Sequence, residues 1–424
     1  GLFTSLHFME FHERYPMKIY KSAVATAIAG VVMATLSVVP AHADPNTITI
    51  WTDSNRQNAT QTAIEDWATA NSVTIKWVIK DFGAQTLRDT FKAAVQAGND
   101  ADLLIGPHDW TGDLVASGQI GTVSLGAAAA GLNAGARAGF AAAGSQYGMP
   151  LYQENIALVR NVHVMSKASK NLSDYIKKGL EVQSWDPNGD PYHWNVFLSS
   201  FGISEYTRDK AGAWTGKQNL GGTKGAAYAK WLSTTGRKIK GPKSSWDQLI
   251  CALQTGQVAG WVTGPWATNT DNLFKSNAAC PGYQLKPTDV AVDPIPSAGG
   301  KTASQFLGAN GVFKSVKVAS ADNALNVGKL IAYLGTSAAQ QSIYTHGTVI
   351  PANLAAQKAA LAYNPLLKGF AVAGANAIAM PAFSYQDAVF QAIGKTERNI
   401  WLGKSTNPAK DWAAMAKAVA ALTQ

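Results

Sequence analysis

Residues 47–105 alternate between two hydrophobic periodicities, and this alternation restricts the fold more than any other feature of the chain. Apolar residues recur at every second position in 47–51 and in 73–79, as in half-buried strands, and 103–105 is a third short apolar run. Two segments between them carry apolar residues at helical spacing: Ala63, Ile64, Trp67 and Ala68, then Leu87, Phe91, Ala94 and Val95. This order predicts an α/β protein with a mainly parallel sheet and crossover helices.

The segment after the third strand carries side chains that suit ligand recognition. In the stretch 101–120, ADLLIGPHDWTGDLVASGQI, a Gly-Pro break is followed by His108, Asp109 and Trp110. The polar segment DSNRQN, which we predict to be a turn and which contains Arg56, follows the first strand in the same way. Because ligands of parallel sheets bind at the carboxyl ends of the strands, we expect both segments to face one site.

The N-terminal part of the chain has the features of an export signal. Residues 1–16 show no clear periodicity and precede a second candidate start, so we interpret them as an upstream remnant. In the predicted signal peptide, 17–43, two lysines precede an apolar stretch, and Ala41-His42-Ala43 is a small-residue cleavage pattern. A membrane anchor is the alternative, since the apolar stretch approaches a bilayer-spanning length. No cysteine follows it, so we expect cleavage without lipid attachment and a location in the periplasm or outside the cell.

Cleavage after residue 43 would leave about 380 residues, more than one hydrophobic core usually holds, which favours two domains. The formal net charge is +9, and it becomes +8 because the leader contains three of the 36 Lys and Arg residues and two of the 27 Asp and Glu residues. The basic residues are scattered rather than gathered in a stripe, which argues against a nucleic-acid partner.

Cysteine and histidine usage restricts the chemistry further. Cys251 and Cys280 are the only cysteines, and in an oxidising compartment we expect them to form a disulfide that contributes about 3 kcal/mol; two free buried thiols are the alternative. The histidines of the mature chain are too dispersed to indicate a metal site, and we expect no metal and no cofactor.

Polar breaks and prolines predict three crossings between the two domains. They are the strand 156–159 after a polar break, the strand 290–296, and 349–351. Other expected elements are helices at 226–234, 246–254 and 322–334, a strand at 258–263 that ends in Gly264-Pro265-Trp266, a surface excursion at 214–223 and Ala-rich helices after 351, while 126–144 is not assigned.

Several runs, taken in order, resemble motifs of the extracellular solute-binding proteins of sugar ABC transporters, particularly the maltose/maltodextrin-binding type. The runs are GND-ADLLIGPHDWTGDLVASGQI, MPLYQENIALVRN, DPYHWNVFL, AGWVTGPWATNT and GTVIPAN. The resemblance implies a two-lobed fold with three crossovers, an oligosaccharide held in the cleft, and delivery of that sugar to a membrane permease. It implies an N-terminal lobe of 44–152 and 298–348 and a C-terminal lobe of 153–297 and 349–424. We expect a monomer.

The resemblance also implies substrate-binding residues. They are Asp109 as the loop carboxylate, Glu154 beside the first crossover, Asp190 and Tyr192 as an acidic-aromatic pair, Trp266 as a stacking aromatic, Arg56 near a polar ligand of the first turn, Tyr385 as a C-terminal aromatic platform, and His108 and Trp110 in the same loop. Two positions depart from the maltodextrin-binding type: Trp110 replaces a basic residue and Gly106 replaces an aromatic one. The departures allow a sugar other than maltodextrin.

The residue types fit a sugar ligand. Carboxylates accept charge-assisted hydrogen bonds from hydroxyl groups, and aromatic rings pack against the apolar faces of a pyranose. Structural alternatives remain open: Asp109 as a helix cap, Trp110 as core, Glu154 as a solvated charge, Asp190 and Tyr192 as an ordinary turn, and His108 as a structural hydrogen-bonding group. We expect a binding protein rather than an enzyme. The alternative functions are a secreted glycoside hydrolase with paired carboxylates, and a binding protein for a non-sugar solute such as a polyamine or a peptide.

Overall fold

The computed structural model describes residues 44–83, 86–183, 187–210, 213–241, 244–268 and 273–423, so the predicted leader lies outside the described residues. The helices of the described chain are α1 (Ser54–Ala70), α2 (Thr86–Ala97), α3 (Thr111–Ala116), α4 (Ala134–Gly139), α5 (Leu172–Lys178), α6 (Pro191–Ser199), α7 (Gly222–Thr234), α8 (Trp246–Gln254), α9 (Ala324–Leu334), α10 (Ser337–Gly347), α11 (Leu354–Tyr363), α12 (Pro365–Ala373), α13 (Gln386–Trp401) and α14 (Pro408–Leu422). The strands are β1 (Thr47–Thr52), β2 (Thr74–Ile79), β3 (Leu103–Pro107), β4 (Ile120–Gly121), β5 (Ala141–Ala142), β6 (Ser145–Gln146), β7 (Gly148–Glu154), β8 (Ala157–Asn161), β9 (Leu180–Val182), β10 (Ser204–Arg208), β11 (Trp214–Asn219), β12 (Gly260–Thr263), β13 (Val290–Asp293), β14 (Phe306–Ser315), β15 (Ile350–Pro351) and β16 (Ile378–Ala379).

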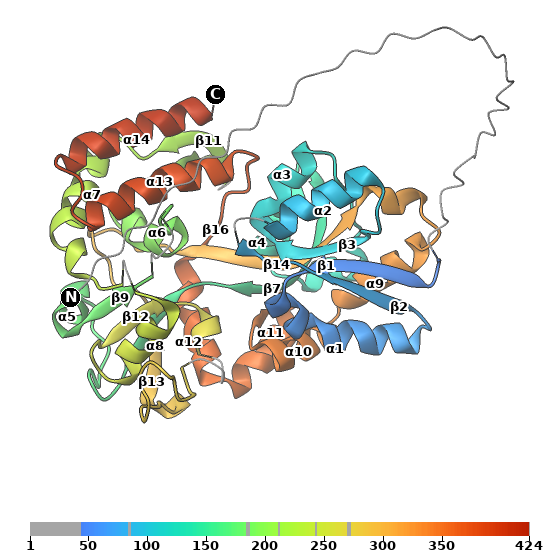
Figure 1. The fold of residues 1–424 in the computed structure, drawn as a ribbon, viewed down its shortest axis with the longest axis horizontal. Coiled ribbons are helices and arrows are strands. Elements are labelled where there is room, and N and C mark those ends of the chain that lie inside the picture. The colour runs from blue at the N-terminus through green and yellow to red at the C-terminus, as the bar shows by residue number, and fades with distance from the viewer. Residues whose placement is uncertain are drawn as a thin grey trace, which may run out of the picture. The chain divides into compact units, whose positions relative to one another are not determined.

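The larger sheet has the strand order β15-β7-β14-β3-β1-β2, and β4 and β16 also pair with β14. β1 runs parallel to both β2 and β3, which confirms the parallel arrangement predicted for these three strands. Both sheets are mixed rather than mainly parallel, because β14 runs antiparallel to β3, β4 and β7, and β8 runs antiparallel to β12 and β13. β14 lies antiparallel between β3 and β7 (Figure 1). The first core, the buried cluster on this sheet, includes the apolar faces of α1 and α2.

The smaller sheet has the order β13-β8-β12-β9. Alternate residues of β8 point into different clusters: Leu158 belongs to the second core with helices α6, α7, α13 and α14, whereas Val159 belongs to the third core with α8, α11 and α12. A strand covered on both faces shows a continuous apolar run rather than alternation. This explains why 156–159 is apolar throughout.

Short connections join the two sheets. Two residues separate β7, in the larger sheet, from β8, in the smaller one. The chain returns to the larger sheet between β13, the last strand of the smaller sheet, and β14. Buried amides hold the connections: Gln305 donates to the carbonyl of Ile156, and Asn155 donates to the carbonyl of Phe370.

The start of α1 differs from the prediction of a polar turn at 53–58. Asp53 accepts hydrogen bonds from the backbone amides of Asn55 and Arg56 and therefore caps a helix that begins at Ser54. An aspartate at this position satisfies amides that the helix itself leaves without partners. Arg56 consequently lies in the first turn of a helix rather than in a loop.

Other elements also differ from the predictions. Residues 214–219, predicted as part of a surface excursion, form β11, which is largely exposed and pairs with β10 in a two-stranded hairpin outside the two main sheets. The unassigned segment 126–144 contains α4 and the short strands β5 and β6. β14, which pairs with four other strands, was not predicted at all.

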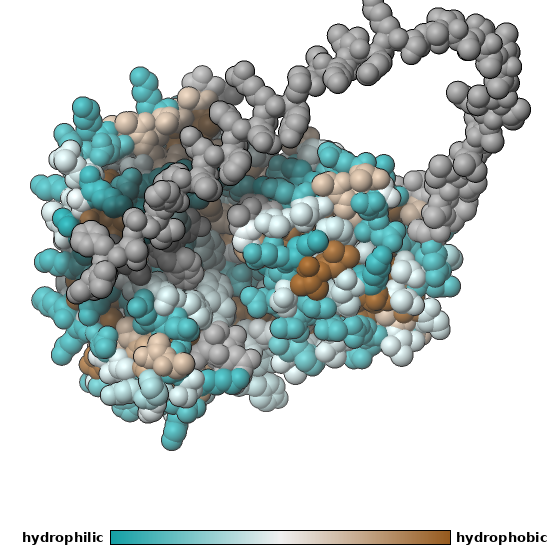
Figure 2. Space-filling model, in the orientation of Figure 1, coloured by the Kyte–Doolittle hydropathy of each residue, from teal (hydrophilic) through white to brown (hydrophobic). Residues whose placement is uncertain are grey.

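Several other expectations hold. The helices at 226–234, 246–254 and 322–334 correspond to α7, α8 and α9. Cys251 of α8 and Cys280 form the predicted disulfide. Within the described ranges, no helix is both long enough and apolar enough to span a membrane. On the face drawn in Figure 2, the described surface is mostly hydrophilic and its apolar residues form a few small groups.

Candidate functional site

Arg56 is held in a fixed position at the start of α1. Its Nη1 lies 2.6 Å from Oδ2 of Asp53, and its Nε donates to Oδ1 of Asn310 at 2.8 Å. Burial opposes the charge of the guanidinium, but Tyr152, Asp53 and Glu154 more than offset this effect and raise the pKa of Arg56. The side chain is therefore a permanent, buried positive charge beside Glu154.

His108 attaches its loop to two other segments. Its side chain is 1% exposed, and Nδ1 accepts from the backbone amide of Ala309 at 3.0 Å. The opposite nitrogen, Nε2, then carries the proton and donates to the carbonyl of Met380 at 3.1 Å. Both ring nitrogens thus bond to backbone, so the ring fixes the position of the Asp109 loop.

Trp110 is a core residue in this structure. The indole is 1% exposed and stacks on Phe82, with the ring centroids 5.5 Å apart. A Cβ atom at Gly106 would lie 2.7 Å from Cζ3 of Trp110. The two departures from the maltodextrin-binding type are therefore one feature: the indole occupies the space that a side chain at 106 would need.

Asp109 lies between His108 and Trp110 in a short 3-10 turn (His108–Trp110) and is partly buried. It does not cap α3, which has no side-chain cap in the structure. Burial raises the pKa of Asp109, His108 lowers it, and Asp387 raises it further. The carboxylate is therefore available to accept hydrogen bonds from a ligand. Such a bond would offset part of the free-energy cost of holding its charge in a buried position.

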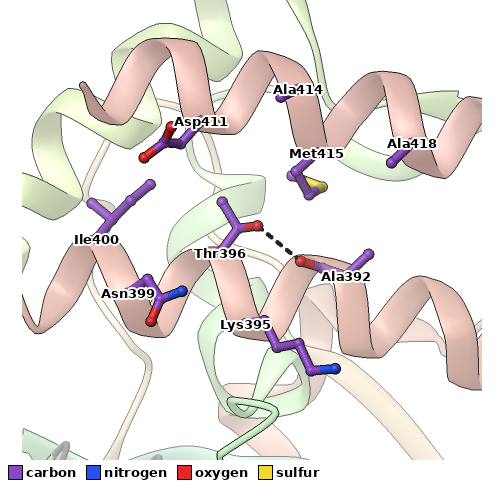
Figure 3. A pocket seen from close by; sticks show the side chains of 9 residues that line it. All are labelled: Ala392, Lys395, Thr396, Asn399, Ile400, Asp411, Ala414, Met415 and Ala418. Atoms are coloured by element: carbon purple, nitrogen blue, oxygen red, sulfur yellow. Dashed lines mark hydrogen bonds between the residues drawn. The ribbon is translucent and has the colours of Figure 1, made fainter. Parts of the chain in front are cut away.

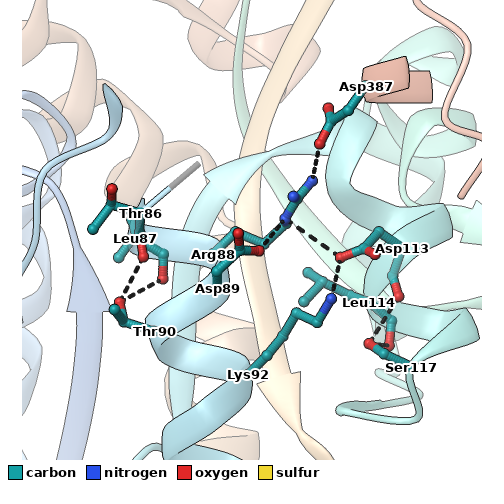
Figure 4. A network of polar contacts seen from close by, with 10 residues as sticks. All are labelled: Thr86, Leu87, Arg88, Asp89, Thr90, Lys92, Asp113, Leu114, Ser117 and Asp387. Carbon is teal, nitrogen blue, oxygen red and sulfur yellow. Dashed lines mark hydrogen bonds and ion pairs between the residues drawn. The ribbon is translucent and has the colours of Figure 1, made fainter. Parts of the chain in front are cut away.

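Asp387, which acts electrostatically on Asp109, belongs to a network of charged side chains (Figure 4). Arg88 of α2 reaches Asp387, the second residue of α13, at 2.8 Å and also contacts Asp89 and Asp113. Lys92 contacts Asp113 at 2.8 Å. The Arg88–Asp387 pair joins a helix of the first core to a helix of the second core.

Glu154 and Tyr192 converge over Gly308. A Cβ atom at Gly308 would lie 3.5 Å from Cγ of Glu154 and 3.6 Å from the Tyr192 hydroxyl oxygen. That hydroxyl is buried and has no hydrogen-bond partner in the part of the chain that the structure describes. Burial raises the pKa of Tyr192 well above its usual range, and Glu154, Asp190 and Asp109 add to the effect. The hydroxyl is therefore a buried donor near the acidic candidate residues Glu154, Asp190 and Asp109.

Asp190 has a structural role at the start of α6. Its side chain accepts from the backbone amide of His193 and from Nε2 of Gln183, and it lies 2.9 Å from Nδ1 of His193. Trp266, in the predicted Gly-Pro-Trp break, lies 6.4 Å from Tyr192 and 6.0 Å from His193 between ring centroids. Aromatic rings thus gather beside the Tyr192 hydroxyl.

Tyr385 belongs to a different aromatic group. It stacks on Phe383 with centroids 5.2 Å apart, and its hydroxyl oxygen would lie 2.8 Å from a Cβ atom at Gly216 in β11. Its other ring contact is with Tyr206, with the centroids 6.2 Å apart. Of the predicted site residues, Arg56, Asp109, Glu154, Tyr192 and Trp266 are linked to one another by electrostatic and ring contacts, whereas the ring contacts of Tyr385 are with Phe383 and Tyr206.

A surface groove of about 440 Å³ lies between α13 and α14 (Figure 3). Its lining residues include Lys395, Thr396 and Asp411, but it contains none of the predicted site residues. It does not take part in the candidate site. In the described ranges, no three His, Cys, Asp or Glu side chains are arranged to hold a metal ion.

Two residues of this region were missed in the sequence. Asn310 bonds to both Arg56 and Glu154. Phe82, 39% exposed, lies under the Arg56 guanidinium at 4.4 Å and against Trp110. The position of Phe82 shortly after a strand was the available signal, because ligands of parallel sheets bind at that end.

The chain matches the family model described as bacterial extracellular solute-binding protein over residues 62–369. Two curated relatives, maltooligosaccharide ABC transporter solute-binding lipoproteins of Streptococcus pneumoniae strains R6 and TIGR4, are each 24% identical to it over 278 residues. Those residues are 62% of this chain and 62% of each relative, so the match spans less than two thirds of the relatives' length.

Solved structures share the fold. The Thermus thermophilus maltotriose binding protein bound with maltotriose aligns with a TM-score of 0.73 at 20% identity, covering 89% of this chain and 100% of that one. The maltose-maltodextrin binding protein of Alicyclobacillus acidocaldarius aligns with a TM-score of 0.71 at 19% identity, covering 88% and 99%. The chain has the two-lobed α/β fold of these proteins, and it belongs to the bacterial extracellular solute-binding proteins.

Proposed function

We propose that the protein is the substrate-binding component of a carbohydrate ABC transporter, which binds a maltodextrin-like oligosaccharide between its two lobes and delivers it to the membrane permease. The observation that carries the proposal is the convergence of Asp109 and Glu154 with Tyr192 and Trp266. The names of the relatives and structural neighbours, which refer to maltooligosaccharides, maltotriose and maltodextrin, support the same ligand class.

The chemistry of the group suits an uncharged sugar. Asp109 and Glu154 offer carboxylate oxygens to hydroxyl groups, and the buried Tyr192 hydroxyl gains the partner it lacks when a ligand oxygen lies beside it. Trp266 supplies a flat apolar face next to these groups. Arg56 balances the negative charge of Glu154. His108, Trp110 and Asp190 hold the segments that carry the binding residues, through backbone hydrogen bonds, packing and helix capping.

The proposed lobes are 44–152 with 298–348, and 153–297 with 349–424. The larger sheet of the first lobe also includes the last two residues of β7 and the short strands β15 and β16, so the chain passes between the lobes close to these positions. Asp109 and Arg56 come from the first lobe, and Tyr192 and Trp266 from the second. A ligand that touches both lobes stabilises their closed arrangement by the difference between its affinities for the closed and the open forms. The permease would recognise the closed form.

The leader and the assembly state belong to the same proposal. A cleavable signal at 17–43 is consistent with membership of an extracellular family, although the curated relatives are named as lipoproteins. We infer that the mature chain acts as a monomer, since one chain supplies residues from both lobes to the site.

A binding experiment with intact sugars tests the function. Isothermal titration and thermal shift would be measured with maltotriose and maltotetraose, with cellotriose as a control of equal size and different linkage. Ligand that binds only the folded state raises the unfolding temperature, so we expect stabilisation by the malto-oligosaccharides.

The same samples separate the alternatives. Chromatography after incubation should return the sugar unchanged; release of new reducing ends would indicate a glycoside hydrolase. Stabilisation by spermidine or a peptide, with no response to any sugar, would reject the carbohydrate ligand in favour of another solute.

A further inference from the structure

Asn310 lies in β14, between the segments that carry Arg56 and Glu154. Its side chain is 2% exposed, and its partners in the sheet are Pro107 of β3 and Tyr152 of β7. Side chains two positions apart on a strand share a face, so Asn310 is on the same face as Gly308, whose partner on β7 is Glu154. The register of β14 therefore brings this amide beside the Glu154 carboxyl.

The two hydrogen bonds of Asn310 determine which way its amide points. Arg56 has only donors, so the atom facing its Nε, at 2.8 Å, must be the oxygen Oδ1. The nitrogen Nδ2 then faces Glu154 and donates to Oε1 at 3.2 Å. This leaves Oε2 of Glu154 without a hydrogen-bond partner among the described residues. Arg56 thus determines which way the Asn310 amide points, and that amide holds Oε1 of Glu154 by a hydrogen bond.

We propose that Asn310 is a positioning residue of the binding site: it holds Glu154 in the ionised form and in one rotamer, with Oε2 presented to a sugar hydroxyl. The inference rests on the proposed sugar-binding function. Asp53, which caps α1 and holds Arg56, completes a continuous chain of hydrogen bonds from the first turn of α1 to the end of β7.

Few other side chains can replace an amide here. Leucine fills the same volume but neither accepts nor donates. Aspartate keeps the acceptor for Arg56 but turns a second carboxylate toward Glu154. Serine is too short to reach both partners. Each change therefore removes the donor to Glu154 in a different way.

The charge of Glu154 responds to several neighbours. Burial raises the pKa of Glu154, whereas Arg56 and Asn310 lower it and Asp53 raises it. Tyr152 and Tyr192 also face the carboxyl. Loss of Asn310 removes a hydrogen bond that lowers the pKa of Glu154, so the Glu154 carboxyl should stay protonated to a higher pH.

The first experiment measures the carboxyl in the ligand-free protein. The ¹³C NMR signal of Glu154 is assigned by its absence in Glu154→Gln and titrated in the wild type, in Asn310→Leu and in Asn310→Asp. We expect the titration midpoint to rise in Asn310→Leu and to rise further in Asn310→Asp, because a second carboxylate repels the first.

The second experiment measures affinity for maltotriose by calorimetry in a double-mutant cycle. Asn310→Leu should weaken binding about tenfold in the wild type, as expected for loss of a hydrogen bond to a charged group, and less than about twofold in Glu154→Gln. The loss of affinity in Asn310→Leu should also diminish as the pH is raised, because Glu154 is then ionised even without the hydrogen bond from Asn310.

Asn323→Leu is the matched control. It removes another buried amide from the same sheet region, one that donates to the carbonyl of Thr47 at the opposite end of β1 from Asp53. It should lower stability without moving the Glu154 titration. If Asn310→Leu does not fold, Asn310→Ser carries the same measurements.

Two results overturn the proposal: a Glu154 titration that is unchanged in the Asn310 variants, or an equal loss of affinity with and without the Glu154 carboxylate. Failure of the wild type to bind both maltotriose and maltotetraose would instead reject the proposed function. In that case the titration of ligand-free protein still decides whether Asn310 controls Glu154.

Discussion

Gly106 and Trp110 form a pair in which each residue requires the other. The indole is packed between Gly106 and Phe82 and has no room to move away from a new side chain. We predict that Gly106→Ala lowers the free energy of unfolding by about 1–3 kcal/mol, the usual cost of overpacking. Urea unfolding measures this.

The partner variant tests the cause. In a Trp110→Leu background, the smaller side chain leaves space for a methyl group, so Gly106→Ala should then cost less than about 0.5 kcal/mol. Equal costs in both backgrounds would mean that the glycine is required for another reason, such as its pairing with Gly311 of β14.

Trp266 tests the aromatic side of the site. We predict that Trp266→Ala weakens maltotriose binding by about 1–3 kcal/mol, because stacking surface is lost where the ligand is desolvated. Calorimetry measures the change. Trp77→Ala is the control, since Trp77 lies on β2 and donates to Glu65 outside the site. Wild-type affinity in a folded Trp266→Ala protein would remove this ring from the site.

The candidate residues could be predicted only as far as the sequence links them to local structure. Asp109 could be chosen because it follows a strand, where ligands of such sheets bind, and Glu154 because of the resemblance to the sugar-binding family. Asn310 could not be chosen, since its role depends on Arg56, 254 positions away, and on Glu154, 156 positions away. Those contacts come from strand register, which the local sequence does not specify.

An ion pair joins helix α2 to helix α13, which belong to the two proposed lobes. Arg88 and Asp387 come from helices that pack in different cores, so the pair is complete only when the lobes are close together. We predict that Asp387→Asn weakens maltotriose binding about fivefold by destabilising the closed form, and that it enlarges the radius of gyration in X-ray scattering.

Lys92→Met provides the control for this ion pair. Lys92 lies one turn after Arg88 on α2, and its ion pair in the described part of the chain is with Asp113 of the neighbouring helix α3, within the same proposed lobe (Figure 4). The variant removes a charge from the same network and should leave affinity and size unchanged. Equal effects of the two variants would point to a general electrostatic change rather than to closure.

The elements were predictable where the hydrophobic period was regular. α1 and α2 bury one face each, and β2 has exposed positions between its half-buried ones, so their periods appear in the sequence. β1 and β3 are buried almost throughout and were recognised as short apolar or alternating runs. β14 was missed because its sequence, FLGANGVFKS, contains two glycines and an asparagine, residues that are depleted in strands. Its strand form depends on hydrogen bonds to β3 and β7 on either side, which is a tertiary effect.

Two buried carboxyls of the second core make the stability of the whole molecule dependent on pH. Glu205 accepts from Gln386, and Glu397 accepts from the Tyr228 hydroxyl. Burial raises the pKa of Glu205 to about 8, and burial, with smaller contributions from Asp190 and Glu205, raises the pKa of Glu397 to about 8. Both groups are therefore protonated in the folded protein at neutral pH.

The direction of the pH effect follows from the unfolded chain, where a glutamate has a pKa of about 4.3. Below that value both states are protonated and the full stability is present. Between about 4.3 and 8 the unfolded state loses protons that the folded state keeps, so stability falls as the pH rises, by on the order of 4 kcal/mol per carboxyl. We predict a lower unfolding temperature at pH 8 than at pH 5, measured by calorimetry.

Glu397→Gln isolates the contribution of one carboxyl. Glutamine keeps an acceptor for Tyr228 but cannot ionise, so the difference in stability between pH 5 and pH 8 should shrink by on the order of 3 kcal/mol. Asp66→Asn, at an exposed position of α1, removes one negative charge without burial and should leave that difference unchanged. The comparison depends on the pH difference within each variant, so a uniform loss of stability from the substitution does not affect it. A pH difference in Glu397→Gln as large as in the wild type would show that Glu397 ionises normally in the folded protein.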